Sequence, residues 1–418
     1  MKALLHCFVA TCLAAILVAP AVAASIGDVF YIDMENHNLA QPLSVTSPQQ
    51  LLGNSAAPFL NSLMTPGNPN AAQTSYASNY QNAAAGVHPS LSNYLWQEQG
   101  TNNGVTNDNT PFGSGGVNQG NAPSLSGLLQ AKGIAWKSYQ EDIDLTTTGG
   151  NLTSTVLPQN QWTVPLNNFS GTSTSYTNPY NGSHQYNFAT KHDGQLYFNA
   201  TNGGNNTTPS NALALNYAPL QQLQTDLNNN TVARYSLITP DQYNDMHSPF
   251  DSNFTYNSVV YGAGTDQEAV ALGDSFLSEI IPIIKASQAY QNNGAIVIWF
   301  DETEGGDSSS FTLPEIVISP LAKGNAYQST LRYTHSSDLK TLEELFAAPA
   351  PAGGYLGDAN TAGTNDLSDL FLPNSIAVPE PTSLALAGFA LVGGLFIAAS
   401  DGWWYSLKRR PHDPFTGG

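Results

Sequence analysis

Short apolar segments rich in β-branched and aromatic residues recur along this chain, separated by segments with helical spacing. Five of them are predicted strands, at 28–34, 134–139, 233–239, 295–300 and 315–319. Helices are predicted at 58–64, 90–99, 124–132, 216–227, 273–290 and 337–346, with Pro282 expected to kink or split the fifth. Alternating strands and helices build βαβ units. The chain is therefore predicted to be an α/β protein with a mostly parallel central sheet and helices on both faces.

The charge of the chain argues against one large class of partner. Its 418 residues include 31 acidic and 12 basic side chains, for a formal net charge of −19. Proteins that bind nucleic acid use clustered Lys and Arg to contact phosphates, so no nucleic-acid partner is expected. An acidic balance of this size suits an exported protein or one that binds cations.

The N-terminus has the pattern of a secretory signal. A basic residue precedes an apolar run at 4–18, and small residues at 21–23 form a cleavage pattern, which predicts a signal peptide over 1–24. An uncleaved membrane anchor is the alternative. Both cysteines, Cys7 and Cys12, lie in this segment. The mature protein is therefore expected to contain no disulfide, no thiolate nucleophile and no cysteine zinc site.

The C-terminus carries a second targeting pattern. A Pro-Glu-Pro motif at 379–381 precedes an apolar run at 384–399, and a basic cluster follows at 408–410. This resembles the sorting tail that bacterial exosortases process, which implies an exosortase-type partner and a transmembrane segment within 378–410. A plain membrane anchor is the alternative, and residues 347–377 are predicted to be a linker. Either pattern places the body of the protein outside the cytoplasm, in the medium or on the cell surface.

The body of the chain, 25–346, is predicted to form one domain. Within it, residues 146–211 differ from the rest because Asn, Thr, Ser, Gly and Tyr dominate. This composition predicts an irregular, loop-rich insertion that lies over the site.

Acidic, amide and imidazole side chains follow three of the predicted strands. They are Glu35 and Asn36 after the first strand, Asp241, Asp245 and His247 after the third, and Asp301 and Glu302 after the fourth. Ligands of open α/β sheets bind beyond the carboxyl ends of the strands. Ionised carboxylates are costly to bury there without a counter-charge, and few basic side chains are available. A divalent metal ion is the simplest explanation, although any one cluster alone could be a solvated loop.

A candidate nucleophile lies at the start of the predicted helix 90–99. Ser90 is predicted at its N-cap, where the helix terminus favours the negative charge that develops on an attacking hydroxyl. Asn93, one turn later, could reach an anionic oxygen of the substrate. A metal nearby would stabilise the alkoxide and polarise a phosphoryl oxygen. The alternative is that Ser90 only caps the helix and Asn93 lies on the surface.

Together these motifs resemble the bacterial phosphoesterase family that includes acid phosphatases and phospholipases C, within the alkaline phosphatase superfamily. The matching motifs cover nearly the whole body. They are Glu35-Asn36, the segment 88–94 (His-Pro-Ser-Leu-Ser-Asn-Tyr), 136–142, Lys191-His192, 238–241 with 244–247, Asp301-Glu302 with 305–307, and Tyr333-Thr334-His335.

The resemblance implies roles for particular residues. Ser90 would attack phosphorus and become transiently phosphorylated, and His192 would lie near the phosphate or protonate the leaving group. The remaining site residues fall into two implied groups. Glu35, Asn36, Asp301 and Glu302 would hold a metal, while Asp241, Asp245, His247 and His335 match positions for a second metal or the phosphoryl group.

Two positions depart from the family pattern. Ser92 stands where the family usually has Pro, which loosens the turn without removing a reacting group. Asp301-Glu302 stands where many superfamily members have Asp-His, which leaves the identity and number of metal ions open.

The sequence therefore predicts a secreted or surface-anchored, metal-dependent phosphoesterase, a hydrolase of phosphate esters that acts through a phosphoserine. Monoester, diester and phospholipid substrates all stay open. The alternative function is a non-catalytic cell-surface or matrix protein that binds cations or polysaccharide.

Overall fold

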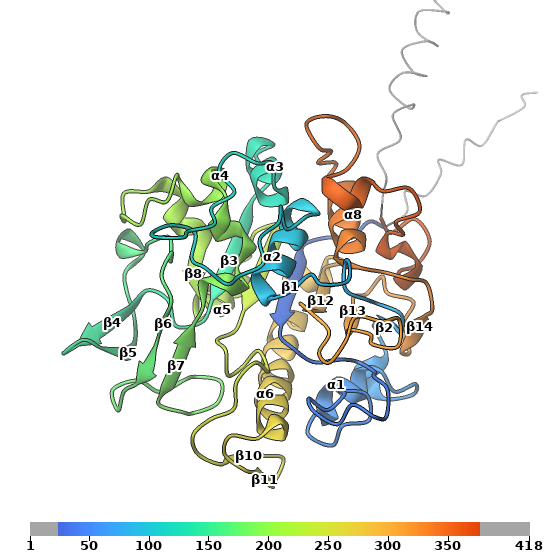
Figure 1. Cartoon of the computed structure of the whole chain (residues 1–418), viewed down its shortest axis with the longest axis horizontal. Helices are drawn as coiled ribbons and strands as arrows, with labels where there is room; N and C mark the ends of the chain where they lie inside the picture. Colours follow the sequence, from blue (N-terminus) through green and yellow to red (C-terminus); the bar gives the residue numbers. More distant parts are fainter. Residues whose placement is uncertain (1–23, 377–418) are drawn as a thin grey trace, which may run out of the picture.

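The computed structural model describes residues 24–376, and an eight-stranded sheet forms its centre (Figure 1). The strands follow the order β14-β2-β13-β12-β1-β9-β3-β8. Their bounds are β1 Val29–Met34, β2 Thr74–Ala77, β3 Trp136–Gln140, β8 Tyr217–Pro219, β9 Tyr235–Thr239, β12 Ala295–Phe300, β13 Glu315–Ile318 and β14 Tyr327–Ser329. Strand β13 runs antiparallel to both neighbours, whereas all other neighbouring pairs are parallel. The predicted α/β class with a mostly parallel sheet is confirmed.

Helices cover both faces of this sheet, as the side chains of the central strand β1 show. Tyr31 donates a hydrogen bond to Asp338 in helix α8, and Asp33 accepts one from Gln97 in helix α2. Met34 points the other way and lies beside Gly273 in helix α6. Because successive side chains of a strand point to opposite faces, α2 and α8 lie on one face and α6 on the other. The helices are α1 Pro58–Leu63, α2 Ser90–Gln99, α3 Leu125–Ala131, α4 Asn199–Asn202, α5 Gln222–Asn229, α6 Asp266–Lys285, α7 Gln288–Gln291 and α8 His335–Leu345.

One predicted helix, 216–227, is wrong in its first half. Residues Tyr217–Pro219 form β8, which pairs in parallel with β3 at the edge of the sheet, and α5 begins only at Gln222. Strand pairing with a distant segment overrode the local helical spacing. Pro282 did not split its helix, because α6 continues through it to Lys285 and α7 follows after the Ser287 cap.

The insertion 146–211 is more regular than its composition predicts. It forms two hairpins at one side of the molecule, β4 (Leu145–Thr148) with β5 (Asn151–Val156) and β6 (Phe169–Thr172) with β7 (Gln185–Phe188) (Figure 1). A small separate core of Leu145, Leu152, Tyr176 and Tyr186 joins them. Downstream of β7 the chain turns inward and buries His192.

The segment predicted as a linker packs against the body of the protein as far as residue 376, where the described part ends. Its apolar side chains Leu356, Leu367 and Leu370 are buried, and the Ser375 carbonyl accepts a hydrogen bond from Ile26 N–H. This stretch is part of the folded unit because it supplies apolar surface to the core. The predicted signal peptide and sorting tail lie outside the described residues, apart from Ala24. Within residues 24–376, no helix combines the length and apolar character needed to cross a membrane.

Candidate active site

Ser90 lies at the base of a buried site where α2 meets the end of β1. It is the first residue of α2 rather than its N-cap, because Pro89 holds the extended backbone that precedes the helix (φ −76°, ψ −168°). Its side chain does not cap the helix. Instead the Ser90 hydroxyl donates to Glu35 Oε2 at 2.9 Å, and the residue is 1% exposed. The predicted position was thus wrong by one residue, but the hydroxyl faces a carboxylate from a strand end.

Lys191 brings a positive charge to the same hydroxyl, and sequence reasoning gave it no role. Its Nζ lies 3.3 Å from Ser90 Oγ, 3.3 Å from His247 Nε2 and 3.3 Å from a carboxylate oxygen of Asp108. Burial alone would lower the pKa of Lys191, but the charges of Glu35 and Asp108 outweigh it and raise that pKa. Lys191 is therefore charged. The sequence feature that could have identified this role is a lysine within an insertion otherwise rich in Asn and Thr.

Glu35, Asn36 and Asp301 form the part of the site that best fits a cation. Asn36 N–H donates to Asp301 Oδ1 at 3.0 Å, whereas Asn36 Oδ1 and Asp301 Oδ2 are buried and find no hydrogen-bond partner among the described residues. Burial, followed by the Glu35 charge, raises the pKa of Asp301. Burial likewise raises the pKa of Glu35, against the opposing charge of Lys191. Unpaired buried oxygens beside carboxylates that resist ionisation suit a hard divalent cation.

Glu302 is held by two neighbours, one just before α2 and one in its first turn. Asn93 Nδ2 donates to Glu302 Oε2 at 3.1 Å, and His88 Nδ1 approaches the same oxygen at 2.5 Å. The Asn93 amide also donates to the Val87 carbonyl at 3.1 Å, so both of its hydrogens are engaged within the protein. The predicted contact between this amide and a substrate oxygen would require one of these bonds to break.

His88 is a second residue that sequence reasoning left without a role. Its Nε2 lies 2.9 Å from Asp307 Oδ1, so both ring nitrogens face carboxylates. The hydrogen bond to Glu302 is the main cause that raises the pKa of His88 to about 9. His88 is therefore charged at neutral pH and fixes Glu302 in place. The sequence feature that could have identified this role is the position of His88, two residues before Ser90.

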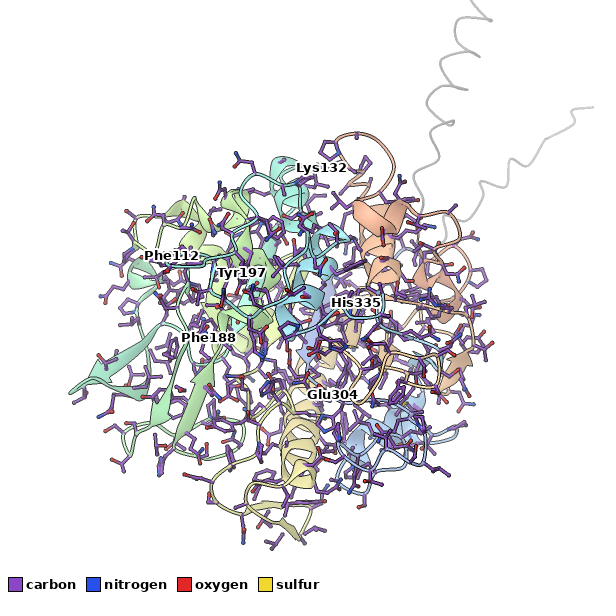
Figure 2. All side chains as sticks on the ribbon, in the orientation of Figure 1. Phe112, Lys132, Phe188, Tyr197, Glu304 and His335 are labelled. Atoms are coloured by element: carbon purple, nitrogen blue, oxygen red, sulfur yellow. The ribbon has the colours of Figure 1, made fainter. Side chains whose placement is uncertain are left out.

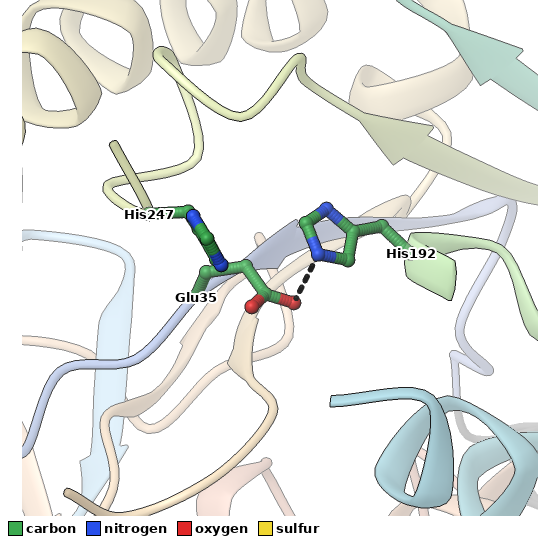
Figure 3. Close-up of side chains that lie close together, drawn as sticks. All are labelled: Glu35, His192 and His247. Atoms are coloured by element: carbon green, nitrogen blue, oxygen red, sulfur yellow. Dashed lines mark ion pairs between the residues drawn. The ribbon is translucent and has the colours of Figure 1, made fainter. Parts of the chain in front are cut away.

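His192 and His247 flank Glu35, one on each side in Figure 3. His192 Nε2 is 3.2 Å from Glu35 Oε1 and its Nδ1 is 3.1 Å from Asp245 Oδ2, but neither approach has hydrogen-bond alignment. Ligand atoms of Glu35, His192 and His247 all lie within 4.8 Å of one another, which fits a shared metal ion. Burial, helped by Lys191, lowers the pKa of His192 well below its usual value. A neutral imidazole is able to bind a metal ion.

Asp245 supports this group from the loop after β9. Its Oδ1 accepts a hydrogen bond from His247 N–H at 2.7 Å, and its carbonyl accepts one from Glu35 N–H. Burial lowers the pKa of His247 to about 4, so this imidazole is also neutral and able to bind a cation. Of the implied second set, Asp245 and His247 therefore join Glu35.

His335 does not join them. It begins α8 (labelled in Figure 2), donates from Nε2 to the Asp301 carbonyl at 2.5 Å and accepts at Nδ1 from Trp299 Nε1–H at 3.2 Å. Burial lowers its pKa to about 3. With both ring nitrogens engaged, His335 positions the end of β12 and is not available as a metal or phosphate ligand.

Asp241 also lies apart from the Glu35 site, in a separate buried group with Glu141 and Asp142. Asp241 N–H donates to Glu141 Oε2 at 2.8 Å, and Asp241 Oδ1 accepts from Tyr243 N–H and Asn244 N–H. Glu141 follows β3 and Asp241 follows β9. These two strands pair side by side in the sheet, which explains why the two residues meet. Sequence position at a strand end was therefore not sufficient to place Asp241 with Glu35.

Without metal, the protein should lose stability as pH rises from about 6.5 to 9. Burial raises the pKa of Asp33 and of Glu141 to about 8, and Glu302 raises that of His88 to about 9. A group whose pKa is higher in the folded state binds more protons there, so its stabilisation is lost as pH rises towards that value. The lowered pKa values of His247 and His335 act in the opposite direction, but only below the unfolded value of about 6.5. Thermal unfolding of chelator-treated protein between pH 6.5 and 9 measures this loss of stability. An unfolding midpoint that rises with pH would contradict the prediction.

The chain matches known proteins over most of its length. The model of the Phosphoesterase family matches residues 70–349, which include Ser90, Lys191, His192 and Asp301. A phosphatidylinositol-3-phosphatase of Mycobacterium tuberculosis is 25% identical over 316 residues, which cover 75% of this chain and 77% of that protein.

Two solved structures are among the similar folds. One is the lipoteichoic acid synthase LtaP of Listeria monocytogenes, with a TM-score of 0.44 and 12% identity over 80% of this chain and 76% of that one. The other is a protein in the alkaline phosphatase superfamily from Vibrio parahaemolyticus, with a TM-score of 0.37 and 14% identity over 78% and 68%. The family match covers more than half of the chain and confirms the predicted family. This chain belongs to the phosphoesterase family and is a phosphoric ester hydrolase.

Proposed function

We propose that the protein hydrolyses phosphate esters with a divalent metal ion and Ser90 as the nucleophile, through a phosphoserine intermediate. The observation that carries this proposal is the position of the Ser90 hydroxyl, which lies between the Glu35 carboxylate (2.9 Å) and the Lys191 ammonium (3.3 Å). A carboxylate can hold the proton that the hydroxyl loses, while an adjacent ammonium stabilises the charge that develops.

The residues of the site account for both halves of the reaction. Ser90 Oγ attacks phosphorus, and the bond from phosphorus to the leaving oxygen breaks as the Oγ–P bond forms. Glu35 Oε2 already accepts the Ser90 hydrogen and can hold it during this step. Lys191 Nζ lies where it can contact an oxygen of the transferring group. The leaving oxygen takes a proton from solvent. Water then attacks phosphorus in the phosphoserine as the Oγ–P bond breaks, and the proton held by Glu35 returns to Ser90. The product is inorganic phosphate from a monoester, or a phosphate monoester from a diester.

The donor atoms at this site fit a divalent metal. Asn36 Oδ1 and Asp301 Oδ2 are buried and unpaired, and Glu35, His192 and His247 place ligand atoms close together. Glu302, fixed by His88 and Asn93, completes the set predicted from the sequence. A metal ion bound by these residues would act as a Lewis acid that lowers the pKa of the hydroxyl and polarises the phosphoryl group.

The substrate class is testable with three esters. Rates on p-nitrophenyl phosphate, bis-p-nitrophenyl phosphate and phosphatidylinositol 3-phosphate separate monoesterase, diesterase and lipid phosphatase activity. The lipid is included because the Mycobacterium tuberculosis relative is named a phosphatidylinositol-3-phosphatase. Purified protein that releases product from none of the three, with Mg²⁺, Mn²⁺, Ca²⁺ or Zn²⁺ supplied, would refute the proposed function.

Replacing Lys191 should impair the chemical step. Lys191→Met removes the ammonium beside Ser90 Oγ and should lower kcat by about 100-fold, the size expected when one preorganised donor to the transition state is lost. Lys132→Met removes the same charge from an exposed position at the end of α3 and serves as the control (Figure 2). Steady-state kinetics of both variants provide the measurement. A Lys191→Met enzyme within twofold of the wild type would rule out this role.

We also propose that the protein is exported and that its tail is processed after export. This rests on the signal and sorting patterns at the two ends of the sequence. Terminal sequencing of protein recovered from culture medium or the cell surface should find a start near Ser25 and no residues from the basic cluster. Intact protein found only in the cytoplasm would contradict export.

A further inference from the structure

We infer that the Asp108 carboxylate occupies the place of the substrate's phosphoryl group, so that a substrate has to displace it. The inference rests on the proposed function and extends it to a residue that controls substrate affinity and selectivity. Asp108 lies in the loop that follows α2, and its side chain turns back to the start of that helix.

The contacts of Asp108 are those that a phosphoryl group beside Ser90 would use. Asp108 Oδ1 accepts a hydrogen bond from Leu91 N–H at 3.1 Å, in the first turn of α2. Its Oδ2 lies 3.3 Å from Lys191 Nζ, which is itself 3.3 Å from Ser90 Oγ. One donor thus belongs to the residue next to the nucleophile and the other contacts the nucleophile directly. Backbone N–H groups in a first helical turn and an adjacent ammonium are typical ligands of phosphate.

The surroundings of Asp108 allow it to leave. Its side chain is 33% exposed, whereas that of Lys191 is 12% exposed, so Asp108 forms the solvent-facing side of the pair. Residues 100–123 contain no regular helix or strand. Among the described residues, the Asp108 carboxylate has no other hydrogen bond or ion pair than those to Leu91 and Lys191. Its movement would therefore break two contacts that an incoming phosphoryl group can replace.

An internal carboxylate at this place changes which esters bind. Only the fraction of protein in which Asp108 has left its two donors can bind substrate, and the apparent affinity is lowered in proportion to that fraction. A phosphate monoester with two negative charges competes with one carboxylate better than a diester with a single charge. Asp108 should therefore weaken binding of all phosphate ligands and disfavour diesters most.

The substitution Asp108→Asn tests this while it keeps a cap on α2. The Asn oxygen can still accept from Leu91 N–H, but the attraction to Lys191 is lost. Asp358→Asn is the matched control, because it removes one acidic charge from an exposed residue that follows α8. In Asp108→Asn the inhibition constant of inorganic phosphate should fall about tenfold, which is the effect expected when one partly buried ion pair no longer competes with the ligand. The KM for p-nitrophenyl phosphate should fall with it. The ratio of diester to monoester kcat/KM should rise. Asp358→Asn should change none of these.

Two results would overturn the inference. One is an inhibition constant for phosphate that stays the same or increases in Asp108→Asn. The other is a kcat more than tenfold lower with an unchanged inhibition constant, which would make Asp108 a catalytic residue. Equilibrium binding of inorganic phosphate to wild type and Asp108→Asn gives the comparison without turnover. If the wild type hydrolyses no ester, the proposed function fails, whereas this binding difference still decides whether Asp108 holds an anion position.

Discussion

Ser90→Ala should lower kcat by at least about 10³-fold and leave the fold intact, because loss of a nucleophile removes the covalent route and only binding and electrostatic effects remain. Within residues 24–376, the Ser90 hydroxyl makes no hydrogen bond other than those with Glu35 and Lys191, so the helix should form without it. Steady-state kinetics give the rate. Acid-quenched reactions with a phosphate-labelled ester should leave label on the wild type and none on Ser90→Ala.

Ser92→Ala is the matched control for this experiment. Ser92 lies in the same turn of α2, but its hydroxyl donates to the Val105 carbonyl at 2.7 Å and does not face Glu35. Its loss should change kcat by no more than a few-fold. It also tests the departure from the family pattern at this position. Full activity in Ser90→Ala, or equal label on the wild type and Ser90→Ala, would exclude Ser90 as the nucleophile.

Removal of the metal should abolish activity and also lower stability. A ligand present at 100 times its dissociation constant stabilises the folded state by about 2.7 kcal/mol, and a chelator removes this contribution. Asp301→Asn should lose both the activity and the shift of the unfolding midpoint that metal produces, because it removes one charged ligand. In the absence of metal the same variant should be no less stable than the wild type, since burial and the Glu35 charge disfavour an ionised Asp301.

Asp274→Asn provides the control for a buried carboxylate outside the site. Asp274 accepts hydrogen bonds from Phe59 N–H and Leu60 N–H at the start of α1 and has no contact with Glu35 or Asp301. This variant should be less stable but should keep the metal-induced shift. Differential scanning calorimetry with and without Mg²⁺, Mn²⁺, Ca²⁺ and Zn²⁺ measures both effects. Activity that persists in strong chelator, with an unchanged midpoint of thermal unfolding, would exclude a role for a metal ion.

Elements with a clear local pattern were predictable from the sequence. Strand 295–300 and helix 90–99 have the predicted bounds in the structure, because an uninterrupted apolar run and a helical run after Pro89 are local signals. Strand β2 (Thr74–Ala77) was missed and β8 was predicted as helix. Both are short and depend on pairing with β13 and β3, which are distant in sequence. A strand whose stability comes from its neighbours leaves a weak local signal.

The sequence by itself determined the family, the α/β class and the residues that follow the strands, because these depend on short patterns and on side-chain chemistry. Only the tertiary structure decided which of those residues meet. It placed Lys191 against Ser90, 101 positions away, and directed His335 to the Asp301 carbonyl and Asp241 to Glu141. A strand end fixes where a residue lies along the sheet edge. The direction and partner of its side chain depend on long-range packing, which no local pattern records.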